Sequence, residues 1–474
     1  MDVPIVSLRK EEVIQRMLWC AGMKMIQSPL TRMGVFFGTL LLVLTSFNIL
    51  WADSPPTEDD LSFYEQFQEM AKTGIHAPLG FHYYWHEGLH MDSPKNRFRA
   101  KLSGRVIVDG GYIGADEAIQ SAFPDFRGGD ANFRDLRLTL TGIVYDHIDF
   151  EFDIDFANIR DIKDIWIGYK KAPFLGDIKV GHFREPISLE RLNALADITF
   201  MERALPTEAF APGRNMGIMC NNKILDDRMT WAAGAFLLTG SFENIGDFND
   251  QLSEAFGTAL TARVTGLPRY ADNGRQLLHL GLSYSRQFRN EQRAESDLKL
   301  RTHPESRLTD QVLVNTGRFP TNSMDLLGGE LATVSGPLSF QGEFFHALTD
   351  ASTVGNPRFW GFYGYASYFL TGEHRSYNRS LGLFSGIAPE QDFHLLDEGW
   401  GAWELAFRFS YVDLNDKAVK GGKEANFTFG VNWYLSEKSR FMFNFIHAKV
   451  TDRADPPIDD GRANIFQIRF QYSI

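Results

Sequence analysis

The sequence predicts an all-β protein, a transmembrane antiparallel β-barrel of about sixteen strands with a cleaved N-terminal signal segment. Three observations support this prediction: an export leader, strand-like alternation along most of the chain, and connections of uneven length. The clearest alternation is HIDFEFDIDFA, residues 147–157, in which charged and apolar residues alternate. Successive side chains of an extended strand point to opposite faces, so one face of this segment is ionised and the other is apolar.

The first 52 residues have the layout of a secretory signal. Lys24 and Arg32 precede one long apolar run, Gly34–Trp51, and Ala52 and the polar stretch DSPPTEDD follow it. We expect cleavage after Ala52, and we interpret residues 1–23 as an over-long start. A permanent anchor helix is the alternative, because the run is near the lower length limit for crossing a bilayer.

Alternating segments recur almost to the end of the chain. NFTFGVNWYL is one example, and the final segment, IFQIRFQYSI, ends at the last residue, Ile474. We count about sixteen to eighteen such segments, each close to the ten or so residues that cross a bilayer as a tilted strand. The predicted organisation is a signal peptide at 1–52, a periplasmic N-terminal segment at 53–78 and a β-barrel domain at 79–474.

The connections between these segments differ in length. YLSEKSR and VSGPLS are short, whereas four connections are predicted to be long and polar: 110–131, 184–213, 286–309 and 450–462. Short turns at one end and long loops at the other are typical of barrels in an outer membrane.

A large soluble exported β protein that binds sugars or surfaces is the alternative fold, because its strands also alternate. The leader, the 40 Phe residues and the strand that runs to the last residue favour the membrane barrel. In that barrel Phe150 and Phe152 face lipid. The carboxylates of Asp149, Glu151, Asp153 and Asp155 face the water-filled lumen, because a carboxylate in hydrocarbon costs about several kcal/mol.

The composition excludes several classes of function. The chain has 48 Lys and Arg against 60 Asp and Glu, a formal net charge of −12, which argues against nucleic-acid binding. Cys20 leaves with the leader, so Cys220 has no disulfide partner. No catalytic motif, cofactor or metal site is predicted. His82, His86 and His90 in FHYYWHEGLH are the best zinc candidates, but polar positions on a strand or in a loop explain them without a metal.

Cations occupy alternate positions in RFRAKLSGRVIVD. Arg97, Arg99, Lys101 and Arg105 share one face, and side chains two residues apart on that face stand about 6.6 Å apart along the strand. Arg137, in RDLRLTLTG, faces the same way as Asp135 and Thr139. One interpretation is a relay of anion sites, because guanidinium groups bind phosphate and carboxylate bidentately. The other is that these cations only balance the lumen carboxylates of residues 149–155.

A second arginine-rich segment is VGHFREPISLERLNALADITFMERALPTEAFAPGRNMGI, residues 180–218. Arg184, Arg191, Arg203 and Arg214 stand here among many apolar residues. This mixture suits a connection folded into the lumen, which it would narrow. The alternative is a loop packed at the rim, with its arginines paired to Glu185, Glu190 and Glu202.

This segment, with YFLTGEHRSYNR, GWGAWELAFRFSYVDLND, NWYLS and NIFQIRFQ downstream, resembles the phosphate-selective porin O and P family. The resemblance runs from about residue 97 to the end of the chain. It implies an outer-membrane barrel of about sixteen strands, commonly a homotrimer, with inward-folded loops and an arginine-rich route for small anions such as phosphate. It places Arg184 and Arg203 at a constriction. The family usually has Lys where this chain has Arg184, which keeps the charge.

The predicted function is a channel in the outer membrane through which small hydrophilic solutes diffuse passively. Anion or phosphate selectivity is one form of this prediction. A non-selective or cation-leaning general porin is the alternative, because the chain is acidic and the strand at 149–155 lines the lumen with carboxylates. The sequence indicates no enzyme activity.

Overall fold

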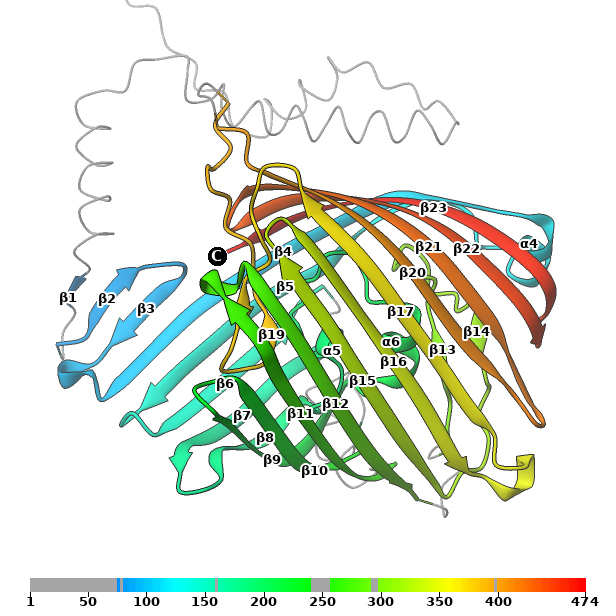
Figure 1. The fold of residues 1–474 in the computed structure, drawn as a ribbon, viewed down its shortest axis with the longest axis horizontal. Helices are drawn as coiled ribbons and strands as arrows, with labels where there is room; N and C mark the ends of the chain where they lie inside the picture. Colours follow the sequence, from blue (N-terminus) through cyan, green and yellow to red (C-terminus); the bar gives the residue numbers. More distant parts are fainter. Residues whose placement is uncertain (1–74, 77–79, 158–160, 240–255, 291–296, 396–398) are drawn as a thin grey trace, which may run out of the picture. The chain divides into compact units, whose positions relative to one another are not determined.

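A computed structural model describes residues 75–76, 80–157, 161–239, 256–290, 297–395 and 399–474 (Figure 1). The predicted leader, the anchor-helix alternative and most of the segment 53–78 lie outside these residues. No helix among the described residues is long and apolar enough to cross a membrane.

The described strands form a closed antiparallel barrel of 16 strands, which confirms the predicted fold class. The ring consists of β4 (Phe98–Ala115), β5 (Gly128–Val144), β6 (Ile148–Asp155), β7 (Asp161–Ala172), β8 (Gly176–Arg184), β9 (Arg214–Ile224), β10 (Met229–Leu237), β11 (Gly257–Ala271), β12 (Gln276–Arg289), β15 (Ser323–Ser335), β16 (Leu338–Asp350), β17 (Arg358–Phe369), β20 (Ala402–Asp416), β21 (Val419–Ser436), β22 (Ser439–Ala454) and β23 (Pro457–Ser473). Each strand pairs with the next, and β23 returns to β4, from Ala463↔Ala115 to Ser473↔Arg105. Closure leaves no strand edge open to lipid.

Shorter elements lie before the ring and in its connections. Before it come β1 (Ile75–His76), β2 (His82–Trp85), β3 (Leu89–Asp92) and η1 (Pro94–Asn96), and β3 pairs with the start of β4. The connections contain α4 (Glu117–Ala122), α5 (Leu189–Leu192), α6 (Leu205–Phe210), η3 (Asp272–Gly274), β13 (Arg301–Thr302), β14 (Val314–Asn315), η5 (Ser352–Val354), β18 (Tyr377–Asn378) and β19 (Leu383–Phe384).

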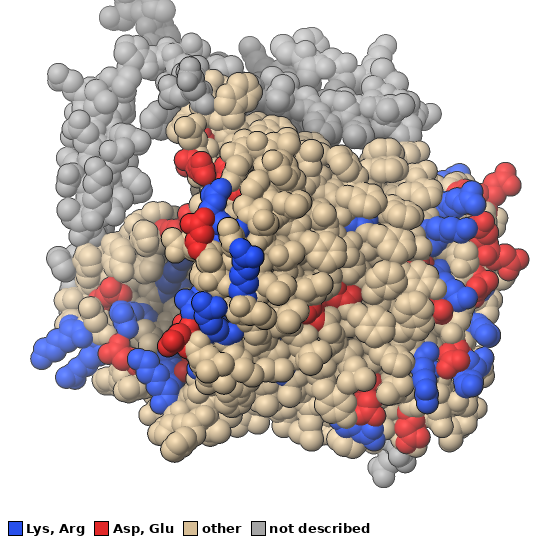
Figure 2. Space-filling view, in the orientation of Figure 1, with Lys and Arg blue, Asp and Glu red and all other residues tan. Residues whose placement is uncertain are grey.

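The two faces of the strands divide as the alternation predicts. On β6, Phe152 is 44% exposed on the outer face, whereas Asp153 and Asp155 are 4% and 1% exposed inside the barrel. The outer face of β20–β23 is lined by phenylalanines, including Phe407, Phe427 and Phe443. In Figure 2 the charged side chains gather mainly toward two ends of the visible face, and most of the surface between them is uncharged. This distribution is the one expected of a surface that contacts the hydrocarbon of a bilayer.

The two ends of the barrel differ. At the end that holds Ile474, which we call the turn end, short turns such as 145–147, 336–337 and 437–438 join the strands. At the opposite end, the loop end, the longest connections are 185–213 and 290–322. In outer-membrane barrels the short turns face the periplasm.

Two predicted connections differ from the structure, and one long connection lies at the end where short turns are expected. The prediction of a long loop at 450–462 is wrong, because β22 and β23 continue through it and only two residues separate them. The loop predicted at 110–131 is shortened to 116–127 by the longer β4 and β5. The connection 370–401, between β17 and β20, is long although it lies at the turn end.

The final strand provides a test of closure. Deleting residues 465–474 should abolish assembly, because these residues pair with both β22 and β4 and their loss opens the ring in lipid. The measurement is the SDS-resistant folded band, before boiling, in outer-membrane fractions. Deleting residues 82–92 is the control, because β2 and β3 lie outside the ring and should be dispensable for closure. Normal insertion of the chain that lacks residues 465–474 would contradict a closed barrel.

Candidate functional site

Three connections fold into the barrel lumen. They are 185–213, which contains α5 and α6, residues 297–322 of the β12–β15 connection, and the part of the β17–β20 connection around β18 and β19, where Phe384 is buried in one cluster with Leu189 and Leu277 (Figure 1). Inward apolar side chains of β15–β23, such as Phe345, Phe359 and Ile446, form one buried cluster with Leu205 and Leu313 of the first two connections. The apolar core therefore fills one side of the lumen, and the wall of β5–β9 is left to line the other.

Polar side chains of the wall hold connection 185–213 by its backbone. The carboxylate of Glu343 on β16 accepts hydrogen bonds from the first N–H groups of α5, at Leu189 (2.9 Å) and Glu190 (2.7 Å). Asn444 on β22 accepts a bond from the Met201 N–H at 2.9 Å. Asn432 on β21 donates to the Thr199 carbonyl at 2.8 Å. The connection is thus fixed inside the lumen, as the first interpretation of this segment predicts.

Glu185, Glu190 and Glu202 of this connection bond to the wall rather than to the connection's own arginines. Glu202 pairs with Arg134 at 2.6 Å and with Arg469 at 2.7 Å. Glu190 lies 3.4 Å from Arg408. Glu185 accepts hydrogen bonds from Asn215 and Thr261. The alternative of a rim loop with internal Arg–Glu pairs is therefore wrong.

A polar cavity of about 580 Å³ lies between the wall of β5–β9 and the two inward connections of the loop end. Its lining contains eight cationic side chains and the carboxylate of Asp310. The cations are Arg134 and Arg137 of β5, Lys163 of β7, Arg184 of β8, Arg214 of β9, Arg191 and Arg203 of connection 185–213, and Arg307 of connection 297–322.

Three of these arginines bond only to backbone oxygens. Arg184 donates to the carbonyls of Leu192 (2.8 Å) and Asn193 (3.1 Å). Arg191 donates to the Pro212 carbonyl at 3.1 Å, and Arg203 donates to the Glu190 and Asn193 carbonyls at 3.2 and 3.0 Å. No carboxylate of the described residues lies within 4.0 Å of these three guanidinium groups.

Their positive charges are therefore not neutralised by a direct ion pair. Burial and the neighbouring charge of Arg191 lower the pKa of Arg203. A guanidinium stays protonated near neutral pH even so. An anion that entered the cavity would reduce the repulsion between the positive charges of Arg191 and Arg203.

The other five cations of the cavity have acidic partners. Arg137 bridges Asp135 (2.6 Å) and Asp153 (2.9 Å), and Arg214 binds Asp164 at 2.5 Å. The remaining pairs are Arg134–Glu202, Lys163–Asp155 and Arg307–Glu208. These pairs hold the wall in place, so the excess of positive charge comes from Arg184, Arg191 and Arg203.

The structure brings together some predicted anion-pathway residues and separates others. Arg137, Arg184 and Arg203 line the cavity, and Arg105 binds Asp135, the carboxylate that also binds Arg137. The remaining members lie toward the turn end. Arg97 precedes β4. Arg99 pairs with Asp146 of a turn, and the side chains of both Arg99 and Asp146 are more than 40% exposed. Lys101 lies 3.9 Å from Glu87.

Sequence reasoning did not single out Arg134, Lys163 or Arg307 as cavity residues. Arg134 occupies an irregularity in the β4–β5 pairing, where Ile107 pairs with Asp135 and Val108 with Phe133, so it departs from the alternation of β5. Arg307 comes from a connection whose path into the lumen has no periodic pattern. Two charged residues in succession, Arg134 and Asp135, are the sequence signal of this irregularity, because both must point into the lumen.

Three of the four predicted lumen carboxylates have cationic partners on neighbouring strands. Asp153 pairs with Arg137, Asp155 with Lys163 at 3.4 Å, and Asp149 with Lys170 at 3.7 Å. Oxygens of Glu151, Asp153 and Asp164 approach within 4.8 Å of one another, a spacing that also suits a metal ion. Since two of the three are already bound to arginine, protein cations balance most of this charge.

The histidine candidates lie on the hairpin before the ring. His82 is in β2, His86 in the following turn and His90 in β3, so they do not share a helical face. The His90 ring stacks on Tyr84, and its Nε2 bonds to the His86 carbonyl at 2.8 Å.

The chain matches the family model for phosphate-selective porin O and P over residues 109–474. It belongs to this family. The chain is therefore an outer-membrane porin, a passive diffusion channel for small hydrophilic solutes.

The relatives and solved structures to which the chain is similar are distant from it in sequence. Porin O of Pseudomonas aeruginosa is 22% identical over 425 residues, which cover 81% of this chain and 90% of that protein. An uncharacterized protein of Caulobacter vibrioides is 27% identical over 368 residues, 76% of this chain and 70% of its own. Among solved structures, the anion-selective porin of Comamonas acidovorans is 12% identical with a TM-score of 0.48, over 80% of this chain and 100% of that one. The channel DcaP of Acinetobacter baumannii is 12% identical with a TM-score of 0.49, over 80% and 99%.

Proposed function

We propose that this porin prefers anions and that oxyanions such as phosphate bind transiently in the arginine-lined cavity on their way through the barrel. The proposal rests on one observation: Arg184, Arg191 and Arg203 line the cavity without a direct carboxylate partner among the described residues. Guanidinium groups donate paired N–H bonds that match the oxygens of phosphate and carboxylate.

The acidic balance of the whole chain does not oppose this selectivity. The formal net charge is −12, but an ion in the passage responds mainly to charges within a Debye length, about 8–10 Å in salt near physiological strength. Five of the eight cations in the cavity lining are paired with carboxylates, which leaves Arg184, Arg191 and Arg203 against the single carboxylate of Asp310. Carboxylates at the ends of the barrel are screened by water and salt.

The proposal includes two further points. Family membership supports a homotrimer, in which each barrel would conduct separately. The proposal assigns the chain no catalytic step and no bound cofactor, because diffusion through a cationic passage needs neither.

The test is ion selectivity in a planar lipid bilayer. Purified protein in a KCl gradient should give a reversal potential on the anion side, because the unpaired arginines attract chloride and repel potassium. Added phosphate should reduce the chloride current at concentrations well below that of chloride, because a multivalent oxyanion occupies the arginine site longer. Ester hydrolysis by the same preparation should stay at background.

A general porin that prefers cations is the second candidate. It is favoured by Asp149 and Glu151, which lie half-buried on the lumen face of β6, and by Glu151 in particular, for which no ion pair is found among the described residues. A reversal potential on the cation side would show that these carboxylates set the field, and the phosphate proposal would then be rejected while the porin assignment stood.

A further inference from the structure

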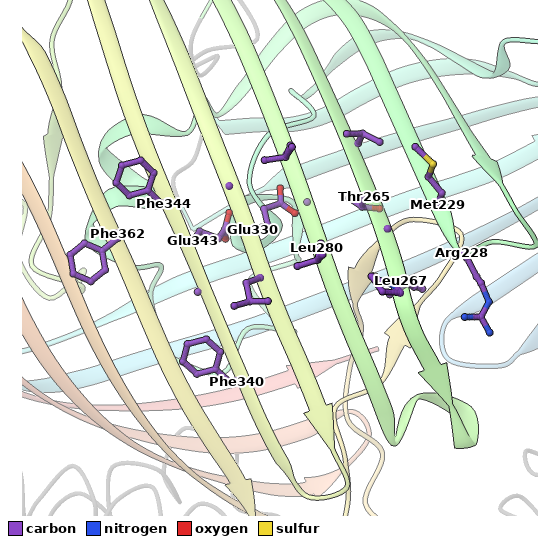
Figure 3. Close-up of a pocket in the computed structure, with 18 of the residues that line it drawn as sticks. Arg228, Met229, Thr265, Leu267, Leu280, Glu330, Phe340, Glu343, Phe344 and Phe362 are labelled. Carbon is purple, nitrogen blue, oxygen red and sulfur yellow. The ribbon is translucent and has the colours of Figure 1, made fainter.

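The outer surface of the barrel has an apolar hollow of about 1070 Å³ across β11–β17 (Figure 3). Its lining includes Gly266, Leu280, Gly329, Gly342 and Phe344, and it reaches Arg228 in the turn before β10. Ligand pockets typically have volumes of about 300–1,000 Å³, so the hollow is large enough for a ligand.

The hollow exists because small residues replace the outward phenylalanines of the neighbouring strands. On β20 and β21 the outward positions hold Phe407, Phe409 and Phe427, whose rings pack against one another. In the hollow, Gly266 and Gly329 have no atom within 4 Å of the place where a Cβ would stand. Leu282 and Phe344, at its side, are 67% and 48% exposed.

The strand register gives the hollow its direction. Gly266 pairs with Leu280, Leu280 with Leu331, Leu331 with Gly342, and Gly342 with Gly364. This row of outward positions crosses five strands, a distance of about 19 Å at roughly 4.8 Å per strand.

The row climbs the barrel as it crosses the strands. It starts at Met229, the first residue of β10 at the turn end, and after Gly364 it continues through Phe409 and Asn464 to Gly114, near the loop end. With strands tilted by about 35–45°, 19 Å of the row spans roughly 12 Å of membrane depth, close to half of the ~30 Å hydrocarbon core. The row therefore begins at the periplasmic rim and ends near the middle of the bilayer.

Arg228 stands at the rim end of this row. It is exposed, and its backbone carbonyl accepts a bond from the Leu267 N–H at 2.8 Å, which places it beside Gly266. Its guanidinium has no ion pair among the described residues, and the adjacent Asp227 is already bound to Lys223 at 2.8 Å. Figure 3 shows the Arg228 side chain extending past the strand end rather than along the hollow. A cation at the periplasmic rim of the barrel lies at the same depth as the phosphate groups of the inner leaflet.

We propose that the hollow is a binding site for one phospholipid of the inner leaflet of the outer membrane, with an acyl chain along the row from Gly266 to Gly364 and the phosphate at Arg228. The cationic head site at Arg228, an apolar floor in which Gly266, Gly329 and Gly342 leave room between leucines and phenylalanines, and the length of the row together match an anionic glycerophospholipid. A second copy of this chain is the competing occupant.

The test is a titration of the full-length mature protein in detergent with dioleoyl phosphatidylglycerol, followed by native mass spectrometry. Arg228→Gln should weaken binding about fivefold, the effect of one cation at a membrane surface. Binding of dioleoyl glycerol, which has the same chains and no phosphate, should be the same in this variant as in wild type.

Substitutions in the apolar floor test the acyl-chain site separately from the phosphate site at Arg228. The double variant Gly266→Leu, Gly329→Leu should lose at least tenfold in affinity for both lipids, and its backbone should tolerate the change because both positions are open. Ala425→Leu is the matched control, since it adds the same side chain to the outer face of β21, away from the hollow, and should bind both lipids as wild type does. Wild-type lipid affinity in the double variant would overturn the proposal. Dissociation of the oligomer in that variant would overturn it too, because it would make the hollow a subunit contact.

Discussion

Replacing Arg184, Arg191 and Arg203 together with glutamine is expected to abolish the anion preference and to lower phosphate affinity by a factor of roughly 100. Each unit charge about 4 Å from an anion contributes about 1 kcal/mol even with the screening of bulk water, so three contribute about 3 kcal/mol. Glutamine keeps N–H groups that can donate to the backbone carbonyls these arginines now bind, so connection 185–213 should keep its fold. The measurement is the reversal potential together with the concentration of phosphate that halves the chloride current.

The matched control removes three cations from elsewhere on the same chain. Arg97→Gln, Arg99→Gln, Lys101→Gln changes the net charge by the same amount, but these residues lie outside the cavity lining and Arg99 and Lys101 face exposed carboxylates at the turn end. Phosphate affinity should stay within about twofold of wild type, because these cations lie outside the cavity and their exposed ion pairs contribute only about 0–1 kcal/mol to stability. Equal losses in the two variants would show that net charge, not the cavity, determines selectivity.

Period-two alternation was sufficient to predict the barrel and the division of its faces. Phe152 outside and Asp153 inside follow directly from the geometry of a strand with water on one side and lipid on the other. The same logic identified Arg137 as a lumen residue. It fails where the ladder is irregular, as at Arg134, because an extra residue in one strand shifts which side chains point inward.

The predicted cation ladder shows a different limit of the sequence. Arg97, Arg99, Lys101 and Arg105 alternate correctly, but alternation gives the face of a strand and not the depth along the barrel axis. Depth depends on which residues pair with the neighbouring strands, and the first part of β4 pairs with β3 instead of β23. Of these four, only Arg105, the first residue of β4 paired with β23, shares a carboxylate with a cavity residue, because Asp135 binds both Arg105 and Arg137.

The inward connections could not be placed from local pattern, because their positions depend on long-range polar contacts. Glu343 and Asn444 look like ordinary lumen residues in the sequence, yet they bind the backbone of connection 185–213 from strands more than 150 residues later. The mixture of arginines and apolar residues suggested the inward fold of this segment, and the family resemblance implied it as well. Neither signal predicted that Glu185, Glu190 and Glu202 bind the wall, so that Arg184, Arg191 and Arg203 remain available to an anion.

Arg469→Met should destabilise the folded barrel by about 3–5 kcal/mol, the usual cost of removing one partner from a buried ion pair. The Arg469 side chain on β23 is 0% exposed and binds Asp109 of β4 through two bonds of 2.7 Å, across the seam that closes the ring. It also binds Glu202 at 2.7 Å. Methionine fills similar space without charge, so Asp109, which is 2% exposed, would be left without its cation.

Two further variants identify the cause of that loss. Arg462→Met, on the same strand, removes an exposed pair with Asp460 and should cost at most about 1 kcal/mol. Arg469→Met, Asp109→Leu removes both buried charges and should recover most of the stability, because an apolar pair can replace a buried ion pair at little cost and Glu202 keeps Arg134. The measurement is urea unfolding in lipid vesicles followed by tryptophan fluorescence. If the double variant is as unstable as the single one, the loss comes from the freed end of connection 185–213 at Glu202, and the seam contributes little.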